Sequence, residues 1–240
     1  MSERGSRAVI LAGGKGTRLH PYTTAFPKPL MPIGEMPILE IIIRQLKQAG
    51  VSDLTLSVGH LHGLLRAYFA NGERWGVNIE YSLETEPLGT AGPIALVEGL
   101  DQTFLVLNGD LLCSLDYRDM IERHRASGAI ATIATYSKKV TIPLGVLEIE
   151  GERLVDYVEK PVMSYQVSMG IYALEPAALG FIPKGQRLDL PDLMKQLMAS
   201  GEHINLYCFD GYWRDIGTME EYITAGEEFD AMRGSLRLGD

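Results

Sequence analysis

The sequence contains little of what marks secreted, membrane-spanning or metal-centred proteins. It has only two cysteines, Cys113 and Cys208, each in an apolar segment, so packing explains them better than a disulfide framework or a metal site. No apolar run approaches the roughly eighteen residues that a membrane span needs. The first residues lead directly into an apolar segment without a signal-peptide pattern. These absences predict a protein of the cytoplasm with no membrane partner.

Positive charge is scarce as well. The formal net charge is −9, with 22 Lys and Arg against 31 Asp and Glu. Such a charge repels nucleic acid over most of the surface, and we expect no nucleic-acid partner. It also opposes the approach of phosphorylated small molecules, so cations must be concentrated locally if such ligands bind. Lys15, Arg18, Lys28 and Lys160 all belong to motifs described below and are candidates for that role.

Histidine is also rare, with five in the chain. His60 and His62 form a His-x-His pair, but no third ligand lies close by in the sequence, and a polar loop explains the pair better than zinc. His124 lies among charged residues in a helical pattern and is expected at the surface. No Ser/His/Asp or Cys/His constellation stands out. We assign no role to any histidine and expect no side-chain nucleophile.

What remains is the composition of an ordinary folded core. Apolar residues make up 46% of the 240 residues and charged residues 22%, and there is no low-complexity segment. No linker rich in Ser or Gly and no internal repeat divides the chain. We therefore predict one domain over residues 1–240, with sub-regions at about 1–136 and 137–240.

Strand and helix patterns alternate through the first sub-region, which predicts an α/β fold with a largely parallel sheet. The expected strands are Ala8–Leu11, Leu54–Val58, Asn78–Ser82, Thr103–Leu107 and Ile130–Tyr136. The expected helices are Pro37–Ala49, Gly63–Phe69, Ala91–Gly99 and Asp116–Ser127. Isoleucines cover much of the girth of the first of these helices, so we expect that helix to pack in the core.

Beyond residue 137 the pattern changes to short strands punctuated by Gly and Pro. The expected strands are Gly145–Ile149, Leu154–Glu159, Val167–Leu174 and Asn205–Phe209. A final helix is expected from Met219 to about Met232, and the last eight residues of the sequence are expected to fray.

The most informative stretch is Leu11–Leu30, which reads LAGGKGTRLHPYTTAFPKPL. An apolar strand runs there into a glycine-rich turn that carries cations. The glycines at positions 13, 14 and 16 let backbone N–H groups approach an anion closely, which a Cβ atom would prevent. Lys15, Arg18 and Lys28 supply positive charge. This combination predicts a phosphate-binding loop, with a nucleoside triphosphate as the ligand.

The spacing differs from two commoner phosphate loops. A dinucleotide-binding fingerprint needs a third glycine where this chain has Leu19, and a P-loop needs Ser or Thr where it has Gly16. A tight strand-to-helix turn with no ligand stays open as an alternative. Arg18 and Lys28 favour a ligand, because Lys28 lies between two prolines that restrict the backbone around it.

Six motifs, in order along the chain, resemble those of the sugar-1-phosphate nucleotidyltransferases, also called nucleotide-sugar pyrophosphorylases. They are Gly13-Gly14-Lys15-Gly16-Thr17-Arg18, Pro27-Lys28-Pro29-Leu30, Glu86-Pro87-Leu88-Gly89-Thr90-Ala91-Gly92, Asn108-Gly109-Asp110, Val158-Glu159-Lys160-Pro161 and Trp213-Arg214-Asp215-Ile216-Gly217. Six ordered matches are far harder to obtain by chance than one, and these span nearly the whole chain.

The resemblance implies a doubly wound, Rossmann-like nucleotidyltransferase fold with a largely parallel, mixed sheet. It places the nucleotide over residues 1–136 and the sugar over residues 137–240. Some members of the family continue into a left-handed β-helix. Because this chain ends too early for one, we expect no C-terminal β-helix and no second activity. A homo-oligomer is compatible with the sequence.

The resemblance also implies a reaction between two small molecules. A phosphate oxygen of the sugar-1-phosphate attacks the α-phosphorus of the triphosphate in line, and pyrophosphate leaves. Asp110 and Asp215 would jointly hold Mg²⁺. Arg18 and Lys28 would hold the triphosphate, and Lys160 the phosphate of the sugar. From the residues alone, a cap or turn explains each aspartate better, and Lys160 can be read as a surface lysine.

Further positions carry over from the same resemblance, some of them outside the six motifs. Those implied to bind the nucleotide are Leu11, Ala12, Gly13, Gly14, Lys15, Gly16, Thr17, Glu84, Gly89, Thr90, Asn108 and Gly109. Those implied to bind the sugar are Gly145, Glu159, Ser168 and Gly170. The family usually has Asn-Ala-Gly where this chain has Ser168-Met169-Gly170, and the shorter hydroxyl reaches less far toward the sugar. The identity of the sugar therefore stays open.

Base choice is expected to depend on Glu84, which follows the strand Asn78–Ser82. A carboxylate only accepts hydrogen bonds; guanine offers two adjacent donors, whereas adenine presents a donor beside an acceptor. The run YSLETEPLGTAG also resembles the guanylyltransferases that make GDP-mannose and GDP-heptoses. We therefore predict GTP and a manno-configured hexose or heptose phosphate as substrates.

Other functions stay open. Uridylyl- and thymidylyltransferases belong to the same family. A non-catalytic regulatory subunit could use the same fold, and a glycosyltransferase would share the sheet and a metal-binding aspartate. The intact set of cations and aspartates argues against the regulatory subunit, and the triphosphate loop argues against the glycosyltransferase.

Overall fold

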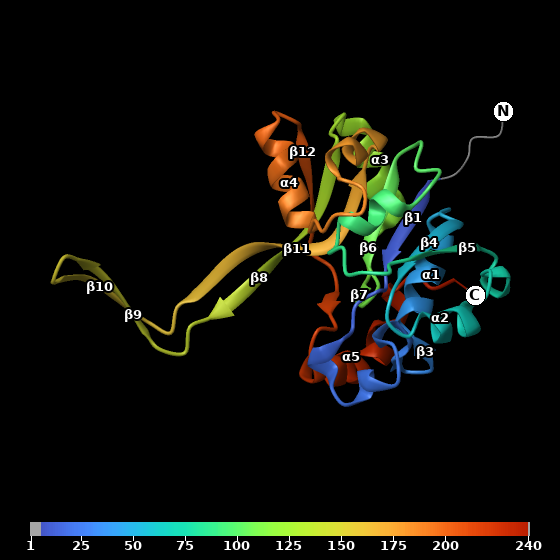
Figure 1. Cartoon of the computed structure of the whole chain (residues 1–240). Helices are drawn as coiled ribbons and strands as arrows, with labels where there is room; N and C mark the ends of the chain where they lie inside the picture. Colours follow the sequence, from blue (N-terminus) through green and yellow to red (C-terminus); the bar gives the residue numbers. More distant parts are fainter. Residues whose placement is uncertain (1–5, 240) are drawn as a thin grey trace.

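The computed structural model describes residues 6–239, and Figure 1 shows how its elements are arranged. The strands are β1 (Arg7–Leu11), β2 (Pro32–Ile33), β3 (Met36–Pro37), β4 (Asp53–Val58), β5 (Asn78–Leu83), β6 (Phe104–Asn108), β7 (Leu111–Cys113), β8 (Ala131–Thr141), β9 (Gly145–Glu150), β10 (Arg153–Glu159), β11 (Val162–Leu174), β12 (Ile204–Phe209) and β13 (Trp213–Asp215). The helices are α1 (Ile38–Gln48), α2 (His62–Phe69), α3 (Tyr117–Ser127), α4 (Leu190–Ala199) and α5 (Met219–Met232). Short 3₁₀ helices lie between them.

Seven strands form one sheet in the order β12-β8-β11-β6-β1-β4-β5. β1 pairs in parallel with both β4 and β6, β4 pairs in parallel with β5, and β8 with β12. β11 is the exception, because it lies antiparallel between β6 and β8. The chain therefore folds as a mixed, mostly parallel sheet, as the alternation of strand and helix patterns predicts.

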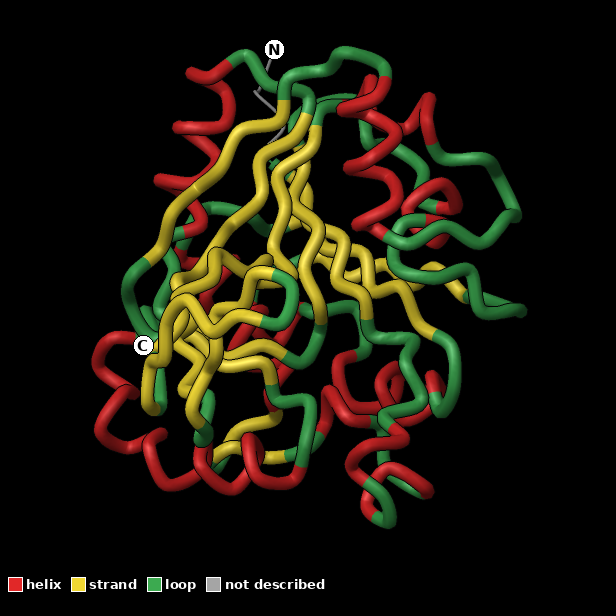
Figure 2. The backbone as a smooth tube through the Cα atoms, turned by 90° about the vertical axis from the view of Figure 1, so that its left-hand side faces the viewer, coloured by secondary structure: helices red, strands yellow, loops and turns green. Residues whose placement is uncertain are grey.

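Both faces of the sheet are covered, because successive side chains along each buried strand point to opposite faces. On β1, Ala8 and Ile10 contribute to one apolar layer and Val9 to the other. Side chains of α1, α2, α3 and α5 complete the first layer, and α4 and two 3₁₀ segments complete the second. Figure 2 shows helices on both sides of the strands. The isoleucines of α1 are buried, as expected.

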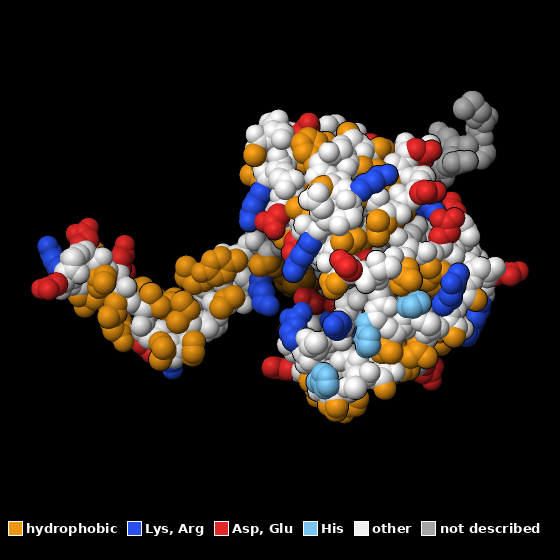
Figure 3. Space-filling view, in the orientation of Figure 1, with side chains coloured by type: hydrophobic (Ala, Val, Ile, Leu, Met, Phe, Trp, Pro, Cys, Tyr) orange, Lys and Arg blue, Asp and Glu red, His pale blue; other side chains and the backbone are white. Residues whose placement is uncertain are grey.

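Residues 137–167 leave the body as a long arm, which Figures 1 and 3 show projecting from the sheet. The stem of the arm is formed by the outer parts of β8 and β11, and its tip is the hairpin β9–β10. Both stem strands therefore run further than the expected strands Ile130–Tyr136 and Val167–Leu174.

Several local predictions are wrong. The helix expected at 91–99 is only a 3₁₀ helix at Gly92–Leu96, in which the N–H groups of Ile94 and Val97 donate to the carbonyls three residues back, Ala91 and Ile94. Helix α4 was not predicted. The C-terminal residues up to 239 do not fray, since Leu236 is fully buried and Arg237 forms an ion pair with Asp116.

Two single-residue predictions are also wrong. His124 is buried on the inner side of α3, where its ring nitrogens lie 2.8 Å from Thr132 Oγ1 and 3.1 Å from Glu175 Oε1. Cys208 is exposed on the edge strand β12, whereas Cys113 is buried as expected. Within residues 6–239, no helix combines the length and apolar character that crossing a membrane requires.

Candidate active site

Four parallel strands end at the same edge of the sheet, and the sequence motifs gather there. These strands, β1, β4, β5 and β6, end at Leu11, Val58, Leu83 and Asn108. From β1 the chain fills the positions to one side with β4 and β5 and then places β6 on the other side, so the strand order reverses between β1 and β6. Open α/β sheets bind ligands in the crevice outside such a switch point.

The glycine-rich loop leaves β1 at this crevice. Gly16 has a φ of +61°, and a Cβ atom there would lie 2.9 Å from Thr23 Cγ2. The Thr23 hydroxyl donates to the Gly16 carbonyl at 2.7 Å, which fixes the turn before the 3₁₀ helix Thr17–Leu19. A Cβ atom at Gly13 would lie only 2.7 Å from Glu84 Oε1. Close packing and a left-handed turn therefore require glycine at these two positions.

Lys28 reaches the same crevice from the Pro-Lys-Pro motif. Its side chain is only 9% exposed, and it begins a 3₁₀ helix, Lys28–Leu30, that follows an extended Pro27. The Lys28 ammonium donates to the Asp110 carboxylate. Arg18 is more exposed, and its guanidinium packs against Gly217, where a Cβ atom would lie 3.2 Å from Nη1.

Asp110 and Asp215 come together because β7 and β13 pair. Asp110 directly precedes β7, Asp215 lies opposite Leu111 across the pair, and the Ile216 N–H donates to the Asp110 carbonyl at 3.1 Å. Desolvation and then the neighbouring Asp110 carboxylate raise the pKa of Asp215, while Lys28 and Arg18 act in the opposite direction. The two carboxylates are thus close enough to repel each other, and a bound cation would relieve that repulsion.

Arg214 fixes the strand that carries Asp215. Its Nε and Nη2 donate to Glu228 at 2.6 and 2.5 Å, and its Nη1 donates to Glu221 at 2.8 Å. Both acids lie on α5, whose first turn is capped by the Thr218 hydroxyl. The Arg214 guanidinium lowers the pKa of Glu228. Charge-assisted hydrogen bonds therefore tie the WRDIG motif to a helix of the body.

Two adjoining cavities open at these residues, with volumes of about 230 Å³ and about 750 Å³. Leu11, Gly14 and Asp110 line both of them. Arg18, Lys28 and Gly217 line the smaller cavity, and Glu84 and Lys15 line the larger one. Each of the twelve residues predicted to bind the nucleotide lines one cavity or the other.

Glu84 is held at the wall of the larger cavity by two hydrogen bonds. Its Oε1 accepts from the Ser57 hydroxyl at 3.1 Å, and its Oε2 accepts from the Leu88 N–H at 3.2 Å. A carboxylate has about four lone-pair sites, so each oxygen can still accept from a ligand. The side chain is thus positioned without being saturated.

Sequence reasoning missed the segment that braces this wall. The Thr90 N–H donates to Asp189 Oδ1 at 3.1 Å, and the Leu190 N–H donates to Thr90 Oγ1 at 2.7 Å. Arg187, just before, lines the larger cavity, as does His60, to which the sequence gave no role. The apolar spacing of α4 behind an aspartate at its N-cap is a signal that could have found this segment.

Ser168 and Gly170 lie at the point where the register between β11 and β8 shifts. A Cβ atom at Gly170 would lie 2.5 Å from Asn108 Nδ2, and Asn108 lines the larger cavity. The Trp213 Nε1–H donates to the Met169 carbonyl at 3.3 Å. The Ser-Met-Gly segment is therefore part of the same edge of the sheet.

Three of the predicted residues do not join this cluster. Gly145 begins β9, Glu159 ends β10 and Lys160 follows it, and Figure 1 shows this hairpin away from the body. Within the hairpin they lie together, since Tyr157 Oη is 3.3 Å from Glu159 Oε2 and occupies the space that a Cβ atom on Gly145 would need. A single chain thus gathers the body residues and leaves these three apart.

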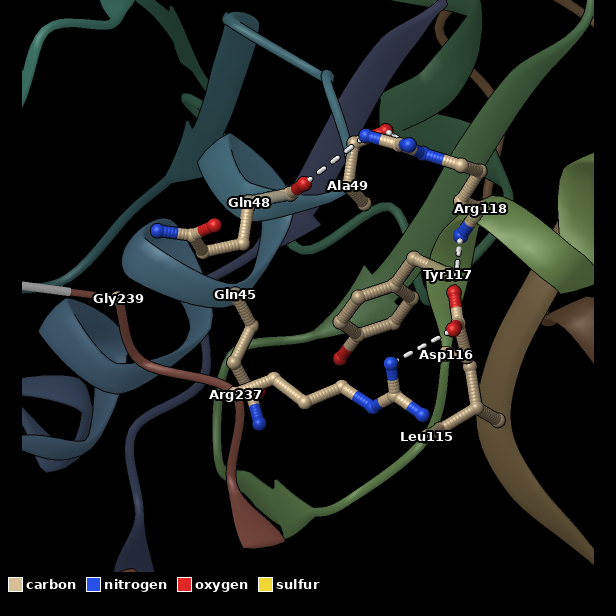
Figure 4. Close-up of a pocket in the computed structure, with 9 residues that line it drawn as sticks. All are labelled: Gln45, Gln48, Ala49, Leu115, Asp116, Tyr117, Arg118, Arg237 and Gly239. Atoms are coloured by element: carbon tan, nitrogen blue, oxygen red, sulfur yellow. Dashed lines mark hydrogen bonds and ion pairs between the residues drawn. The ribbon is translucent and has the colours of Figure 1, made fainter. Parts of the chain in front are cut away.

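A further cavity, of about 390 Å³, lies between α1, the start of α3 and the C-terminal residues (Figure 4). Arg118 donates to the carbonyls of Gln48 and Ala49 at 3.2 and 3.4 Å, and Arg237 pairs with Asp116 at 2.7 Å. Its charged groups already have partners within the protein, and the cavity contains none of the sequence motifs. It is where the C-terminal residues dock.

A doubly wound sheet with a glycine-rich loop and paired aspartates at its switch point is the arrangement that open α/β folds use for ligand binding. The sequence matches the nucleotidyl transferase family over residues 7–231. The chain therefore belongs to that family.

Individual relatives agree with this assignment. The chain is 36% identical over 96% of its length to a UTP–glucose-1-phosphate uridylyltransferase of Synechocystis sp., covering 63% of that protein. It is 35% identical over 91% of its length to a mannose-1-phosphate guanyltransferase of Yarrowia lipolytica, covering 62% of that protein. The chain thus spans slightly less than two thirds of these curated relatives.

The fold agrees as well. A crystal structure of a protein assigned as a glucose-1-phosphate thymidylyltransferase from Bacillus anthracis superposes with a TM-score of 0.77 at 26% identity. The match covers 92% of this chain and 94% of that one. The mixed, mostly parallel sheet expected from the sequence therefore belongs to a fold that this chain shares with that crystal structure.

Proposed function

We propose that this chain transfers a nucleotidyl group from a nucleoside triphosphate to a sugar-1-phosphate and releases pyrophosphate. The observation that carries the proposal is the convergence of all twelve predicted nucleotide residues with Arg18, Lys28 and Asp110 on two adjoining cavities. Membership of the nucleotidyl transferase family supports it, as do the names of its uridylyl- and guanylyltransferase relatives. In this proposal the nucleotide lies over residues 1–136 and the sugar over 137–240.

The residues divide the work by charge. Backbone N–H groups of the glycine-rich loop hold the triphosphate. Arg18 and Lys28 neutralise the charge that pyrophosphate carries as it leaves. Lys160 holds the phosphate of the sugar, and Gly145, Glu159, Ser168 and Gly170 bind the sugar itself. Because a sugar phosphate is already ionised at neutral pH, it attacks through its own oxygen and needs no general base.

The donor set fits Mg²⁺. The part of the chain that the structure describes has no group of three or more His, Cys, Asp or Glu side chains that could hold a metal by itself. Asp110 and Asp215 supply two carboxylates, and Mg²⁺ commonly takes one or two carboxylates and completes its octahedron with phosphate oxygens and water. When bound, the ion offsets charge on the two reacting phosphates. The Lys28 ammonium donates to the Asp110 carboxylate, so the two charges balance each other at that position.

We further propose that the nucleotide is GTP. Glu84 is held by Ser57 and Leu88 at the wall of the larger cavity, and a carboxylate can accept from guanine N1–H and the N2 amino group together. Relatives named for UTP and for guanylyl transfer both match the chain, so this proposal depends on Glu84 rather than on them. For the acceptor we propose a manno-configured hexose or heptose 1-phosphate.

The test is a matrix of pyrophosphate-release assays with Mg²⁺. Each of GTP, UTP, dTTP, CTP and ATP is paired with a panel of hexose and heptose 1-phosphates. We expect the fastest release with GTP and a manno-configured acceptor. A preference for UTP or dTTP would overturn the proposal that the nucleotide is GTP and would leave the proposed reaction standing. Nucleotide binding without release from any pair would indicate a regulatory subunit, and sugar transfer from a nucleotide sugar would indicate a glycosyltransferase.

A further inference from the structure

The tip of the arm has two unlike faces. Residues that lie opposite each other in an antiparallel pair point to the same face, and Leu147 is opposite Tyr157, as Ile149 is opposite Leu154. These four residues form what we call the tip face, and they are 52–63% exposed. The opposite face carries the charged residues Glu148, Glu150, Arg153 and Asp156, with the apolar pair Val146 and Val158 at its inner end. The tip is therefore an amphipathic two-stranded ribbon whose apolar face lies open in a single chain.

We expect the apolar face of this ribbon to be buried against another surface. A two-stranded hairpin is marginally stable by itself, and an open apolar strand surface favours association. Figure 3 shows apolar side chains along the arm and no part of the body against them in that view. Exposed apolar residues continue along the arm at Val140, Leu144, Met163 and Tyr165. Together with the tip face they expose an area on the order of 800 Å², which is what each partner of a standard stable interface buries.

The stem directs the arm away from the site of its own chain. β8 and β11 pair without a break from Thr135 and Ser168 out to Thr141 and Val162, as a direct continuation of two strands of the central sheet. Folding the tip back onto its own body would break this ladder or bend it sharply. Another molecule can therefore pack against the tip face more easily than the body of the same chain can.

The residues at the inner end of the tip face indicate which surface covers it. Gly145 and Glu159 lie opposite each other on that same face, and Tyr157 lies against both. In the proposed function, Glu159 and Lys160 bind the sugar phosphate. The surface that covers the tip face must then be one that binds the other reactant, the nucleoside triphosphate. The body of an identical chain carries the residues proposed for that role, which are Asp110, Asp215 and the glycine-rich loop.

We propose that two copies of this chain exchange arms about a two-fold axis, so that the tip of each covers the candidate active site of the other and supplies Glu159 and Lys160 to it. The inference rests on the proposed function for the identity of the shared ligand. Each copy has an apolar arm to bury and a site without its sugar-phosphate residues, so a reciprocal exchange satisfies both at once. The charged face of the tip stays in water.

Complementation between two variants tests the exchange. One copy carries Asp110→Asn with an intact arm, and the other carries Lys160→Ala with an intact body; each carries a different affinity tag, and the heterodimer is purified through both. Each variant alone is expected to be nearly inactive. In an exchanged heterodimer one of two sites has all its residues, so about half of the wild-type activity should return. If each arm serves its own chain, no activity returns and the proposal is overturned.

The oligomeric state gives a readout that does not depend on activity. We expect wild-type protein to sediment as a dimer and Leu147→Ser/Ile149→Ser to sediment as a folded monomer. The matched control, Glu148→Ser/Glu150→Ser, changes the other face of the same strand and should stay dimeric. A wild-type monomer, or a control that dissociates as readily, would contradict the proposal.

A third measurement separates failure of the exchange from failure of the proposed function. Isotope-labelled and unlabelled copies are mixed, and zero-length carbodiimide coupling is read by mass spectrometry. Links from Lys160 of one copy to an acid of the other copy's body are expected even if no substrate pair releases pyrophosphate. Links confined to single copies would overturn the exchange while leaving the nucleotidyl-transfer proposal standing.

Discussion

The body and the arm hold their predicted site residues in different ways. In the body, Lys28 pairs with Asp110, Arg214 ties the strand of Asp215 to α5, and Glu84 has two hydrogen-bond donors. On the arm, Glu159 lies opposite Gly145 and beside Tyr157, and the Lys160 N–H donates to the Leu144 carbonyl, so these partners within the described part of the chain all belong to the arm. One chain therefore preorganises the body site by itself. The residues of the arm reach a site only when another surface, in our proposal the body of a second copy, packs against the tip face. Nucleotide binding should therefore depend on the body alone.

The largest effect should come from removing one carboxylate of the body. Asp110→Asn should lower turnover by about three orders of magnitude or more, because the pair of charges that holds the metal is lost. Its counterpart, Asp156→Asn on the charged face of the arm, makes the same chemical change and should leave turnover within about twofold. Pyrophosphate release measures both. Near-normal rates for Asp110→Asn in excess Mg²⁺ would remove the metal assignment.

A second pair of variants compares the packing of the two regions. Arg214→Ala should lower the free energy of unfolding by about 1–2 kcal/mol, because Glu228 and Glu221 lose their cation at a partly exposed position. Turnover should fall too, since the strand of Asp215 loosens. Arg153→Ala on the arm should change stability by less than about 0.5 kcal/mol. Urea unfolding gives both values, and equal losses would show that the body is not the more tightly held region.

Base selection should depend on a residue of the body and not on the arm. Glu84→Gln should lower the preference for GTP over ATP by about tenfold. A carboxylate can accept from two adjacent donors through its two oxygens, whereas an amide has one accepting oxygen and no charge. Glu150→Gln on the arm should leave the preference unchanged. The ratio of kcat/KM values for the two nucleotides is the measurement, and an unchanged ratio in Glu84→Gln would exclude it as the base-reading residue.

The smallest effect concerns pH. Burial, against the opposing pull of Glu175, lowers the pKa of His124 below its ordinary value, so the unfolded chain binds a proton there more readily than the folded one. Stability should therefore fall as pH drops below about 6.5, the pKa of an unperturbed histidine. His124→Asn should flatten that dependence between about pH 7 and pH 5. The exposed His203→Asn serves as the control, and an equal slope in wild type and His124→Asn would refute the assignment. The arm contains no histidine, so this dependence belongs to the body.

Much of the body could be predicted from the sequence. Strand β1, helix α1 and helix α5 follow their apolar periodicity, and every predicted nucleotide residue lines a cavity at the switch point. These features are local in sequence or lie at strand ends, and the parallel sheet then brings them together. The assignments of individual ligands to these residues stay predictions.

What could not be predicted depends on long-range packing. The burial of His124 goes with its contacts to Thr132 on β8 and to Glu175, which directly follows β11. The order of the C-terminal residues follows from the docking of Leu236 and Arg237 on α1 and α3. The arm was missed because its stem and tip alternate in the same way as strands that pack on a core. Alternation shows that one face is apolar, but it does not show what covers that face.

The most direct test of the division between body and arm is to measure GTP binding with Mg²⁺ by calorimetry in wild type and in Lys160→Ala, together with the KM for the sugar phosphate. This division predicts an unchanged Kd for GTP and a KM for the sugar phosphate that rises by at least about tenfold, as expected when one charged contact to a phosphate is lost. Loss of GTP binding with an unchanged KM for the sugar phosphate would contradict it.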